Sequence, residues 1–308
     1  MTLLLLAVLL DLAFGEPHNR WHPVAWIGRF VTAARRLAPR ESPKDLALYG
    51  TFLLLVVVSA AAVGALVLQH LIAALPALLV LVLEAFLLKC AFSLRGLFSA
   101  VELVRGHLVI GDLDGARRQL AVHLVSRPTG ELDQGGVGSA AVESLAENLT
   151  DSWVAPLCFY LVAGLPGAWA YRAVNTADAM IGYREGELEH LGRATARVDD
   201  ALNFVPARLS AWAMVAGAWP GRQSAAGARR VLARDAGRTE SPNAGQTMAA
   251  MAGALGVTLE KPGQYWLGDG PPPDLEAMDR AMRVTRWASG LSLGVTLLLL
   301  ALHPVLRL

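Results

Sequence analysis

The chain has 308 residues and a formal net charge of +1, with 54% of its residues hydrophobic and 17% charged. About a quarter of the residues of a soluble domain are charged, so this composition, with a mean hydropathy of +0.43, argues against a soluble globular protein. The near-neutral net charge gives no strong electrostatic field for nucleic acid, and no nucleic-acid partner is expected.

The first apolar run, residues 1–14, has the length of a signal-peptide core. It lacks a basic leader, contains Asp11 and ends in Gly-Glu-Pro rather than in a small-x-small cleavage site, so we expect a retained helix. His22, in the polar stretch 14–28 that follows, precedes a predicted helix start. A histidine at a membrane boundary is more often hydrogen-bonded than a ligand, and that interpretation is favoured here.

Three longer apolar runs predict an all-α, polytopic integral membrane protein. Residues 46–68 are nearly free of charge and exceed the about 20 residues that a bilayer-crossing helix requires. Residues 71–90 form a second run, and the short connection at Gln69–His70 predicts that the two form a helical hairpin. A third span is predicted at residues 287–302. We expect one membrane-embedded catalytic domain over residues 1–308.

Two weaker apolar runs, residues 153–171 and 206–219, are poor membrane spans. The first is interrupted by Pro156 and by Gly-Leu-Pro-Gly at 164–167, and the second contains Arg208. We expect re-entrant or protein-buried helices here, because the polar segments that flank both runs contain candidate functional residues and would then stay on one face of the membrane. Two short ordinary spans are the alternative.

The part of the chain between the last two apolar runs is the most soluble in character. It covers residues 222–286 and contains a predicted loop at 268–274. The two cysteines, Cys90 and Cys158, lie in apolar runs without the spacing of metal ligands. They are expected to be small core side chains rather than a disulfide or a metal site.

Basic residues indicate which side of the membrane the polar segments face. They follow the first predicted helix and the second span of the hairpin, and none lies in the connection between the hairpin helices. The positive-inside rule therefore places residues 15–45 and 93–150 in the cytoplasm. The basic residues concerned are Arg20, Arg29, Arg35, Arg36, Arg40, Lys44, Arg95, Arg105, Arg117, Arg118 and Arg127.

Three carboxylates in the stretch ESLAENLTDSWVAP (143–156) are spaced four residues apart. Glu143, Glu147 and Asp151 would share one face of a helix, where like charges repel. Solvent, basic partners or a bound cation could offset that repulsion. Asn148 extends the polar face toward Trp153, where a merely solvated face is not needed, so a functional cluster is favoured over a solvated one.

Further polar groups interrupt the apolar segments downstream. Each has a plain interpretation as a helix cap or an ion pair, but their joint presence in a chain so poor in charge favours function. Carboxylates bind Mg²⁺ together with substrate phosphates, and arginine forks bind phosphate or carboxylate. No glycine-rich nucleotide loop is present. The groups are Asn175, Asp178, Asp199, Asp200, Asn203, Arg208, Arg234, Asp235 and Asn243, the last in a predicted tight turn with exposed amides.

Five co-linear motifs resemble the CobD/CbiB family of cobalamin (vitamin B12) biosynthesis, the adenosylcobinamide-phosphate synthases. They are DLAFGEPHNRWHPVAWIGR, ESLAENLTDSWVAP, AYRAVNTADAMIGY, RVDDALNFVPARL and SPNAG…MAGALGVTLEKPG, and the similarity runs from about residue 3 to 302. The resemblance implies a membrane ligase that joins adenosylcobyric acid to (R)-1-amino-2-propanol phosphate, or to ethanolamine phosphate, through an ATP-driven amide bond. Three positions depart from the family pattern: Pro128, Ser152 and Gln246–Thr247.

The resemblance also implies roles for the polar residues. Glu143, Glu147 and Asp151 are expected to be catalytic and to hold Mg²⁺ with ATP. Asp178, Asp199 and Asp200 are expected to line the same pocket, one of them acting as base. The residues expected to bind ATP or substrate are Arg127, Asn148, Asn175, Arg184, Asn203, Arg208, Arg234 and Asn243.

The implied location is the bacterial cytoplasmic (inner) membrane, with the active site facing the cytoplasm and with other late corrinoid-pathway enzymes as partners. Two other functions would explain part of the sequence. Asp-Gly-Ala-Arg at 114–117 hints at a Mg²⁺-dependent membrane alcohol phosphotransferase, but the spacing and downstream aspartates of that family are missing. A transporter of polar substrates would explain intramembrane polar residues but not acidic and basic clusters in the loops.

Overall fold

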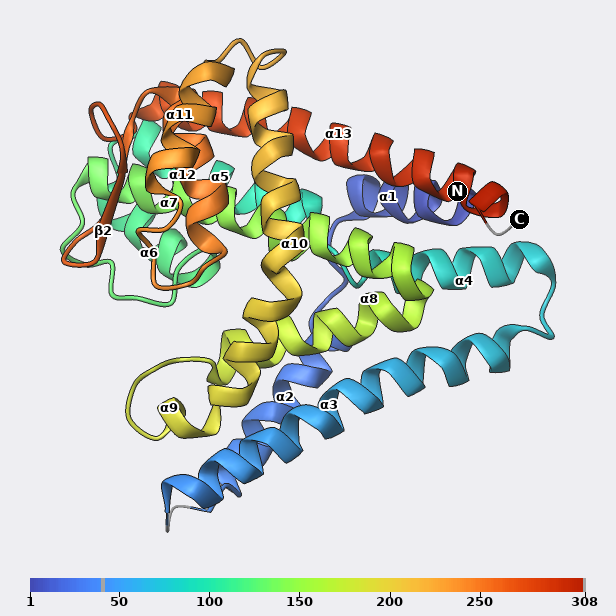
Figure 1. The fold of residues 1–308 in the computed structure, drawn as a ribbon. Coiled ribbons are helices and arrows are strands. Elements are labelled where there is room, and N and C mark those ends of the chain that lie inside the picture. Colours follow the sequence, from blue (N-terminus) through green and yellow to red (C-terminus); the bar gives the residue numbers. More distant parts are fainter. Residues whose placement is uncertain (40–41, 307–308) are drawn as a thin grey trace. The chain divides into compact units, whose positions relative to one another are not determined.

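The computed structural model describes residues 1–39 and 42–306, so Arg40 lies outside the described residues. Figure 1 shows the ribbon. Within those residues the helices are α1 (Thr2–Phe14), α2 (Pro23–Arg36), α3 (Pro43–Ile72), α4 (Ala77–Lys89), α5 (Leu94–Val109), α6 (Leu113–His123), α7 (Gln134–Leu149), α8 (Ala155–Ile181), α9 (Leu188–Leu191), α10 (Arg193–Ala218), α11 (Ala225–Asp235), α12 (Ala244–Leu255) and α13 (Leu275–Leu306).

Two elements were not predicted from the sequence. A π-helical turn, η1 (Thr150–Val154), follows α7 directly. Strands β1 (Thr258–Lys261) and β2 (Tyr265–Gly268) form an antiparallel hairpin with Thr258 opposite Gly268. The fold class is nevertheless confirmed, because helices form almost all of the regular structure.

Helices α3 and α13 have the length and composition of membrane spans. Three helical segments are long and apolar enough to cross a membrane: Pro43–Ile72, Gln134–Ile181 and Leu275–Leu302. The mean hydropathies of their most apolar 18-residue windows are 2.7, 1.4 and 1.4. A fourth span results if α4 and α5 form one bent span, while α1 is a shorter apolar helix. A polytopic membrane protein is therefore confirmed. The prediction of one catalytic domain stays a prediction.

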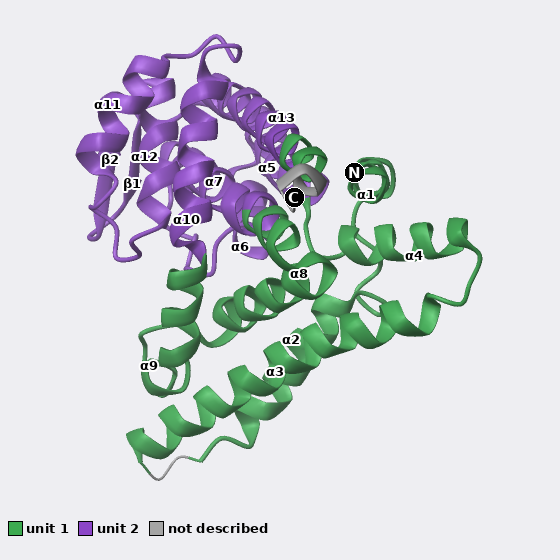
Figure 2. Ribbon diagram, turned by 45° about the vertical axis from the view of Figure 1, so that its right-hand side comes forward, with its two compact units in different colours: residues 1–93, 155–202, 297–308 green, residues 94–154, 203–296 purple. Residues whose placement is uncertain are grey.

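The chain divides into two compact units, both discontinuous in sequence (Figure 2). Unit 1 comprises residues 1–93, 155–202 and 297–308, and unit 2 comprises residues 94–154 and 203–296. Each unit has its own buried core.

In unit 1, helix α3 packs along α8 and also contacts α2 and α9, while α1 packs on α4. Helix starts follow from local chemistry. His22 caps α2 by accepting a hydrogen bond from the Val24 N–H, and Ser42 caps α3 by accepting one from the Asp45 N–H. Proline occupies the first position of both helices, where its missing N–H costs nothing.

The predicted connection between the first two spans was placed too early. Helix α3 continues through Gln69 and His70 to Ile72, and the turn lies just before Pro76. Proline ends a helix, whereas glutamine and histidine do not. Gln69 instead donates a hydrogen bond of 2.8 Å to Glu84 of α4, so each satisfies the other in apolar surroundings.

Helix α8 reverses direction at Ala163 and Gly164, whose backbone angles are not helical. Figure 1 shows the fold-back. The rings of Phe159 and Tyr171 stack with centroids 5.0 Å apart, which places the two arms side by side. Pro156 was predicted to interrupt this run, but it lies in the first turn of α8, where proline is tolerated. The reversal is the geometry that a re-entrant helix requires; its depth in a membrane stays a prediction.

We expect Gly164→Ala to destabilise unit 1. Gly164 has φ 63° and ψ −152°, a region that is essentially restricted to glycine and that costs other residues about 1–3 kcal/mol. The matched control is Gly294→Ala, because a Cβ at that helical position meets no neighbouring atom. The melting temperatures of both variants in detergent provide the measurement. Equal melting temperatures would show that the reversal is not constrained by this glycine.

In unit 2, α11 packs closely on α12, and α7 contacts α5, α6, α12 and β1. Gly227 and Gly253 allow the close approach of α11 and α12: a Cβ on either glycine would lie within 2.4 Å of the other's carbonyl oxygen. Helix α7 is buried along most of its length, so it forms the centre of unit 2.

Helix α10 runs without interruption through Pro206. A proline in a helix interior often interrupts the helix, but α10 continues for 26 residues with Pro206 inside it. The proline removes one backbone hydrogen bond, and Ser210 donates from its hydroxyl to the Pro206 carbonyl one turn later.

Candidate active-site residues

Glu143 is the most constrained carboxylate of the predicted acidic face. It is 5% exposed and accepts a hydrogen bond of 2.7 Å from the Ser139 hydroxyl and one of 3.0 Å from the Tyr265 hydroxyl. The Arg127 guanidinium lies 3.7 Å away. The Ser139 hydroxyl in turn accepts from the Glu260 N–H, so the hairpin β1–β2 fixes both Glu143 partners. This carboxylate is oriented from three sides beside a cation.

Tyr265 is a functional candidate that the sequence did not indicate. Burial raises the pKa of its hydroxyl, and the nearby charges of Glu143 and Glu147 raise it further. The hydroxyl therefore stays protonated at neutral pH and acts as a donor. Sequence patterns did not reveal Tyr265 as a candidate because its partner Glu143 is 122 residues away in the chain, and only the fold brings the two together.

The four-residue spacing of the acids holds only for the first pair. Glu143 and Glu147 lie in α7, whereas Asp151 lies in η1. A π-helical turn contains more residues than an α-helical turn, so Asp151 is displaced from the row. Such turns recur at functional sites. Glu147 is exposed and Asp151 half-buried, so the three carboxylates meet three different environments.

The metal prediction remains open for these residues. Over residues 1–39 and 42–306, no group of three or more His, Cys, Asp and Glu side chains has a geometry that could hold a metal ion. Mg²⁺, however, commonly uses one or two carboxylates and completes its shell with water and substrate phosphates. The assignment of Glu143, Glu147 and Asp151 as ligands therefore stays a prediction.

Arg234 belongs to a carboxylate network in unit 2. Its guanidinium donates to both oxygens of Asp235 and to both oxygens of Asp269. Asp235 is fully buried and also accepts from the Gly268 N–H at 2.9 Å. Burial raises the pKa of Asp235, but the hydrogen bonds from Arg234 and Gly268 outweigh it, and the net shift is downward. The predicted phosphate-binding arginine thus also ties α11 to the loop after β2.

Arg208 and Asn243, which are both predicted to bind ATP or substrate, lie near each other in unit 2. The Arg208 guanidinium stacks 3.5 Å from the centroid of the Phe204 ring and donates to the Phe204 carbonyl. It also lies 3.4 Å from the Asn243 side-chain oxygen. The predicted turn is present at Pro242 and Asn243, but Asn243 is buried at the N-terminus of α12 rather than exposed. Asn203 is buried and Asn148 half-buried in the same unit.

The remaining predicted residues belong to unit 1. Asn175 accepts a hydrogen bond of 3.2 Å from Arg172, which lies one turn before it on α8. Asp178, Asp199 and Asp200 are half-buried, and Arg184 is exposed after the end of α8. That these residues share one pocket with the acids of α7 stays a prediction.

Unit 1 contains a charged cluster that sequence reasoning passed over. Lys89, only 2% exposed, lies 3.0 Å from Glu16 and 3.8 Å from Asp11. This pairing explains an aspartate and a lysine in apolar helices. Glu16 also accepts from Nε2 of His22, whose Nδ1 accepts from Val24. Both nitrogens of His22 are therefore used, as the plain structural interpretation expects.

A cavity of about 330 Å³ adjoins this cluster. Its polar lining comes from the segment after α1, from the segment after α4 and from α8, all in unit 1. Arg172 was quoted in a motif but not assigned a role, and it is the main addition to the candidate set. The polar lining residues are Glu16, Asn19, His22, Ser93 and Arg172.

The pH dependence of stability should reflect Glu16. Burial raises its pKa, but hydrogen bonds from His22 and Ser93 and the charge of Lys89 outweigh burial and lower it from the ordinary 4.5 to about 2. A lowered pKa in the folded state stabilises the fold above the unfolded value and loses that contribution as pH falls from about 4.5 toward 2. We expect Glu16→Gln to flatten the acid limb of melting temperature against pH. An unchanged limb would contradict this account.

A second arginine-lined cavity, of about 380 Å³, lies in unit 2 beside α5 and α13. Arg105 pairs with Asp279 at 2.6 Å and Arg286 with Glu102 at 3.2 Å. Arg283 completes the basic lining.

The Asp-Gly-Ala-Arg stretch has a plain explanation, since Asp114 and Arg117 form a surface ion pair at 2.9 Å on α6. Both cysteines are free, with Cys90 buried and Cys158 half-buried.

The candidate spans together with the buried charged clusters define a helical, membrane-embedded protein. Comparison with known proteins gives its family. The family model described as CobD/Cbib protein matches residues 4–293. The chain belongs to the CobD/CbiB family of cobalamin biosynthesis.

Individual relatives agree with that assignment. The cobalamin biosynthesis protein CobD of Dehalococcoides mccartyi is 42% identical over 269 residues, 87% of each chain. The protein of the same name from Chromobacterium violaceum is 40% identical over 316 residues, 97% of each chain. A probable cobalamin biosynthesis protein CobD of Pyrococcus furiosus is 40% identical over 280 residues, 91% of each chain. No solved structure matches the chain.

Proposed function

We propose that this chain is an adenosylcobinamide-phosphate synthase. It joins the carboxyl group of adenosylcobyric acid to the amine of (R)-1-amino-2-propanol phosphate, or of ethanolamine phosphate, and consumes ATP. Membership of the cobalamin biosynthesis family supports the substrates. The observation that carries the chemistry is Glu143, a buried carboxylate held by Ser139 and Tyr265 with Arg127 beside it. An oriented carboxylate next to a guanidinium suits phosphoryl transfer.

The reaction must first activate a carboxylate, which is a poor electrophile. A substrate carboxylate oxygen attacks the γ-phosphorus of ATP, the bond to ADP breaks, and an acyl phosphate forms. The amine then attacks the acyl carbon, the C–N bond forms, and inorganic phosphate leaves. The base predicted to accept the amine proton is one of Asp178, Asp199 and Asp200.

Residues of unit 2 suit the phosphate-bearing end of this reaction. Mg²⁺ bound with ATP would neutralise charge on the transferring phosphoryl group. Glu143, Glu147 and Asp151 would hold it, and their hard oxygen atoms are the ligands that Mg²⁺ prefers. Hydrogen bonds from Ser139 and Tyr265 orient Glu143 in the way that metal-binding carboxylates are usually supported. Arg127, which lies 3.7 Å from Glu143, would contact a phosphate oxygen.

The proposed location is the cytoplasmic membrane, with these residues on the cytoplasmic side and other late corrinoid-pathway enzymes as partners. In a cysteine-free background, Glu147→Cys and Arg184→Cys, both at exposed positions, should react with an impermeant maleimide only after permeabilisation. The control is Ala74→Cys in the exposed turn before α4, which should react in intact cells. Labelling of residue 147 or 184 from outside would overturn the predicted sidedness.

The direct test is product formation by the purified protein in nanodiscs. Adenosylcobyric acid, aminopropanol phosphate, ATP and Mg²⁺ should together give adenosylcobinamide phosphate, identified by mass. Omission of ATP or Mg²⁺ should abolish the product. Product formed at the same rate without ATP would contradict the proposal, as would no product from a folded protein.

A further inference from the structure

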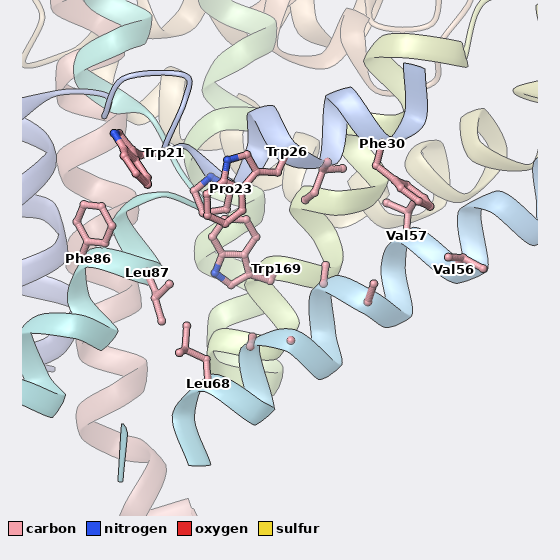
Figure 3. Close-up of a pocket in the computed structure, with 15 residues that line it drawn as sticks. Trp21, Pro23, Trp26, Phe30, Val56, Val57, Leu68, Phe86, Leu87 and Trp169 are labelled. Carbon is pink, nitrogen blue, oxygen red and sulfur yellow. The ribbon is translucent and has the colours of Figure 1, made fainter. Parts of the chain in front are cut away.

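An apolar groove of about 590 Å³ lies within unit 1 (Figure 3). Its lining comes from Trp21 and from α2, α3, α4 and α8, and it consists of aliphatic and aromatic residues. Figure 3 shows Pro23, Trp26 and Trp169 grouped on one side, with α3 running along the other. The residues are Trp21, Pro23, Trp26, Ile27, Phe30, Val56, Val57, Ala60, Ala61, Gly64, Ala65, Leu68, Phe86, Leu87 and Trp169.

The floor of the groove belongs to a membrane span. Helix α3 is the most apolar candidate span, with a mean hydropathy of 2.7, and only 22% of its most apolar window is buried within the protein. Small side chains, among them Ala60, Ala61 and Gly64, hollow its surface here. A groove lined almost entirely by apolar atoms offers water few hydrogen bonds, so hydrocarbon from the bilayer is the occupant that the lining favours.

One end of the groove has the character of a membrane interface. Trp21 and Trp26 are 65% and 49% exposed, and the indole N–H of Trp26 donates to the Arg20 carbonyl. Tryptophan gathers at the interface because its ring is apolar and its N–H polar. The Arg20 guanidinium lies 5.4 Å from the centroid of the Trp21 ring. A positive charge therefore lies at the end of the groove where the phosphate of a lipid would be expected if its acyl chain occupied the groove.

We propose that this groove binds a bilayer phospholipid, with one acyl chain along α3 and the lipid phosphate at Arg20. The apolar lining takes the chain, and the cation takes the headgroup. The groove is lined by residues of unit 1 alone, and the inference does not rest on the proposed catalytic function.

Trp169 reports on the groove because it lines it and yet is only 5% exposed. A variant that retains Trp169 as its single tryptophan is titrated in detergent with phosphatidylglycerol brominated on its acyl chains. Bromine quenches a tryptophan that it contacts, so saturable quenching is expected. A variant that retains only Trp153, which is 1% exposed in unit 2, should not be quenched.

Filling the groove should abolish the effect. A Cβ at Gly64 meets no atom within 4 Å, so the side chain of Gly64→Leu begins in open space within the groove, and quenching of Trp169 should disappear. Gly294→Leu makes the same change at another open helical position and should leave quenching intact. Arg20→Gln should raise the lipid concentration at half-quenching about fivefold.

Wild-type protein provides an independent readout if the single-tryptophan variants do not fold. Native mass spectrometry should detect a retained phospholipid on the wild type and on the Gly294→Leu control, but not on Gly64→Leu. Quenching that survives Gly64→Leu would overturn the proposal. So would a groove filled by a second copy of the chain, shown by a dimer that Gly64→Leu makes monomeric and by no quenching of Trp169.

Discussion

The Glu147→Gln variant is expected to lose about a hundredfold or more in turnover while it keeps its fold. Glu147 is exposed at the end of α7, so glutamine fits without repacking. The change removes one of the negative charges proposed to hold Mg²⁺ with ATP, and it also relieves repulsion from Glu143 one turn away. The measurement is single-turnover product formation at saturating ATP, together with the melting temperature.

Glu131→Gln is the matched control, since Glu131 is also an exposed acid of unit 2. It should keep near-normal turnover. Normal turnover in Glu147→Gln would show that Glu147 belongs to a solvated helix face and would remove it from the proposed site.

The largest expected effect on stability comes from Asp235→Asn. Asp235 is fully buried, and its carboxylate accepts from Arg234 and from the Gly268 N–H while lying 3.2 Å from Arg238. Loss of this charge weakens several charge-assisted hydrogen bonds at a buried acceptor, each of which contributes about 1.5–3 kcal/mol. We expect a marked fall in the melting temperature of unit 2, followed through the fluorescence of Trp266 on β2.

Asp269→Asn provides the comparison. Asp269 also pairs with Arg234, at 2.8 Å, but its side chain is 57% exposed. An exposed pair contributes at most about 1 kcal/mol, so this variant should melt close to the wild type. Equal, small shifts in both variants would show that the buried network does not hold the hairpin to α11.

Sequence patterns predicted the spans well because hydropathy over a long window is a strong signal. Residues 46–68 and 287–302 fall inside α3 and α13. Turn positions were weaker. The polar pair Gln69–His70 suggested a connection, but both residues suit a helix, and the half-buried side chain of Gln69 is hydrogen-bonded to Glu84. The residue that marks the connection is Pro76, which immediately precedes α4.

The site was predicted in its residue types rather than in its arrangement. Strict four-residue spacing put Glu143, Glu147 and Asp151 in one row, but the π-helical turn interrupts it after Leu149. Nothing in the local sequence marks such a turn. Tyr265 and Lys89 were missed because their partners, Glu143 and Glu16, lie far away in sequence. Long-range contacts of this kind follow from the fold alone.

The central claim is that ATP activates the corrinoid carboxylate for amide formation, and an oxygen-isotope experiment tests it most directly. Adenosylcobyric acid labelled with oxygen-18 in the reacting carboxyl group is turned over by the purified protein in nanodiscs with ATP, Mg²⁺ and aminopropanol phosphate. The account predicts ADP and amide in equal amounts, with one oxygen-18 atom transferred to each inorganic phosphate. Amide formed without label in the phosphate, or without consumption of ATP, would contradict it.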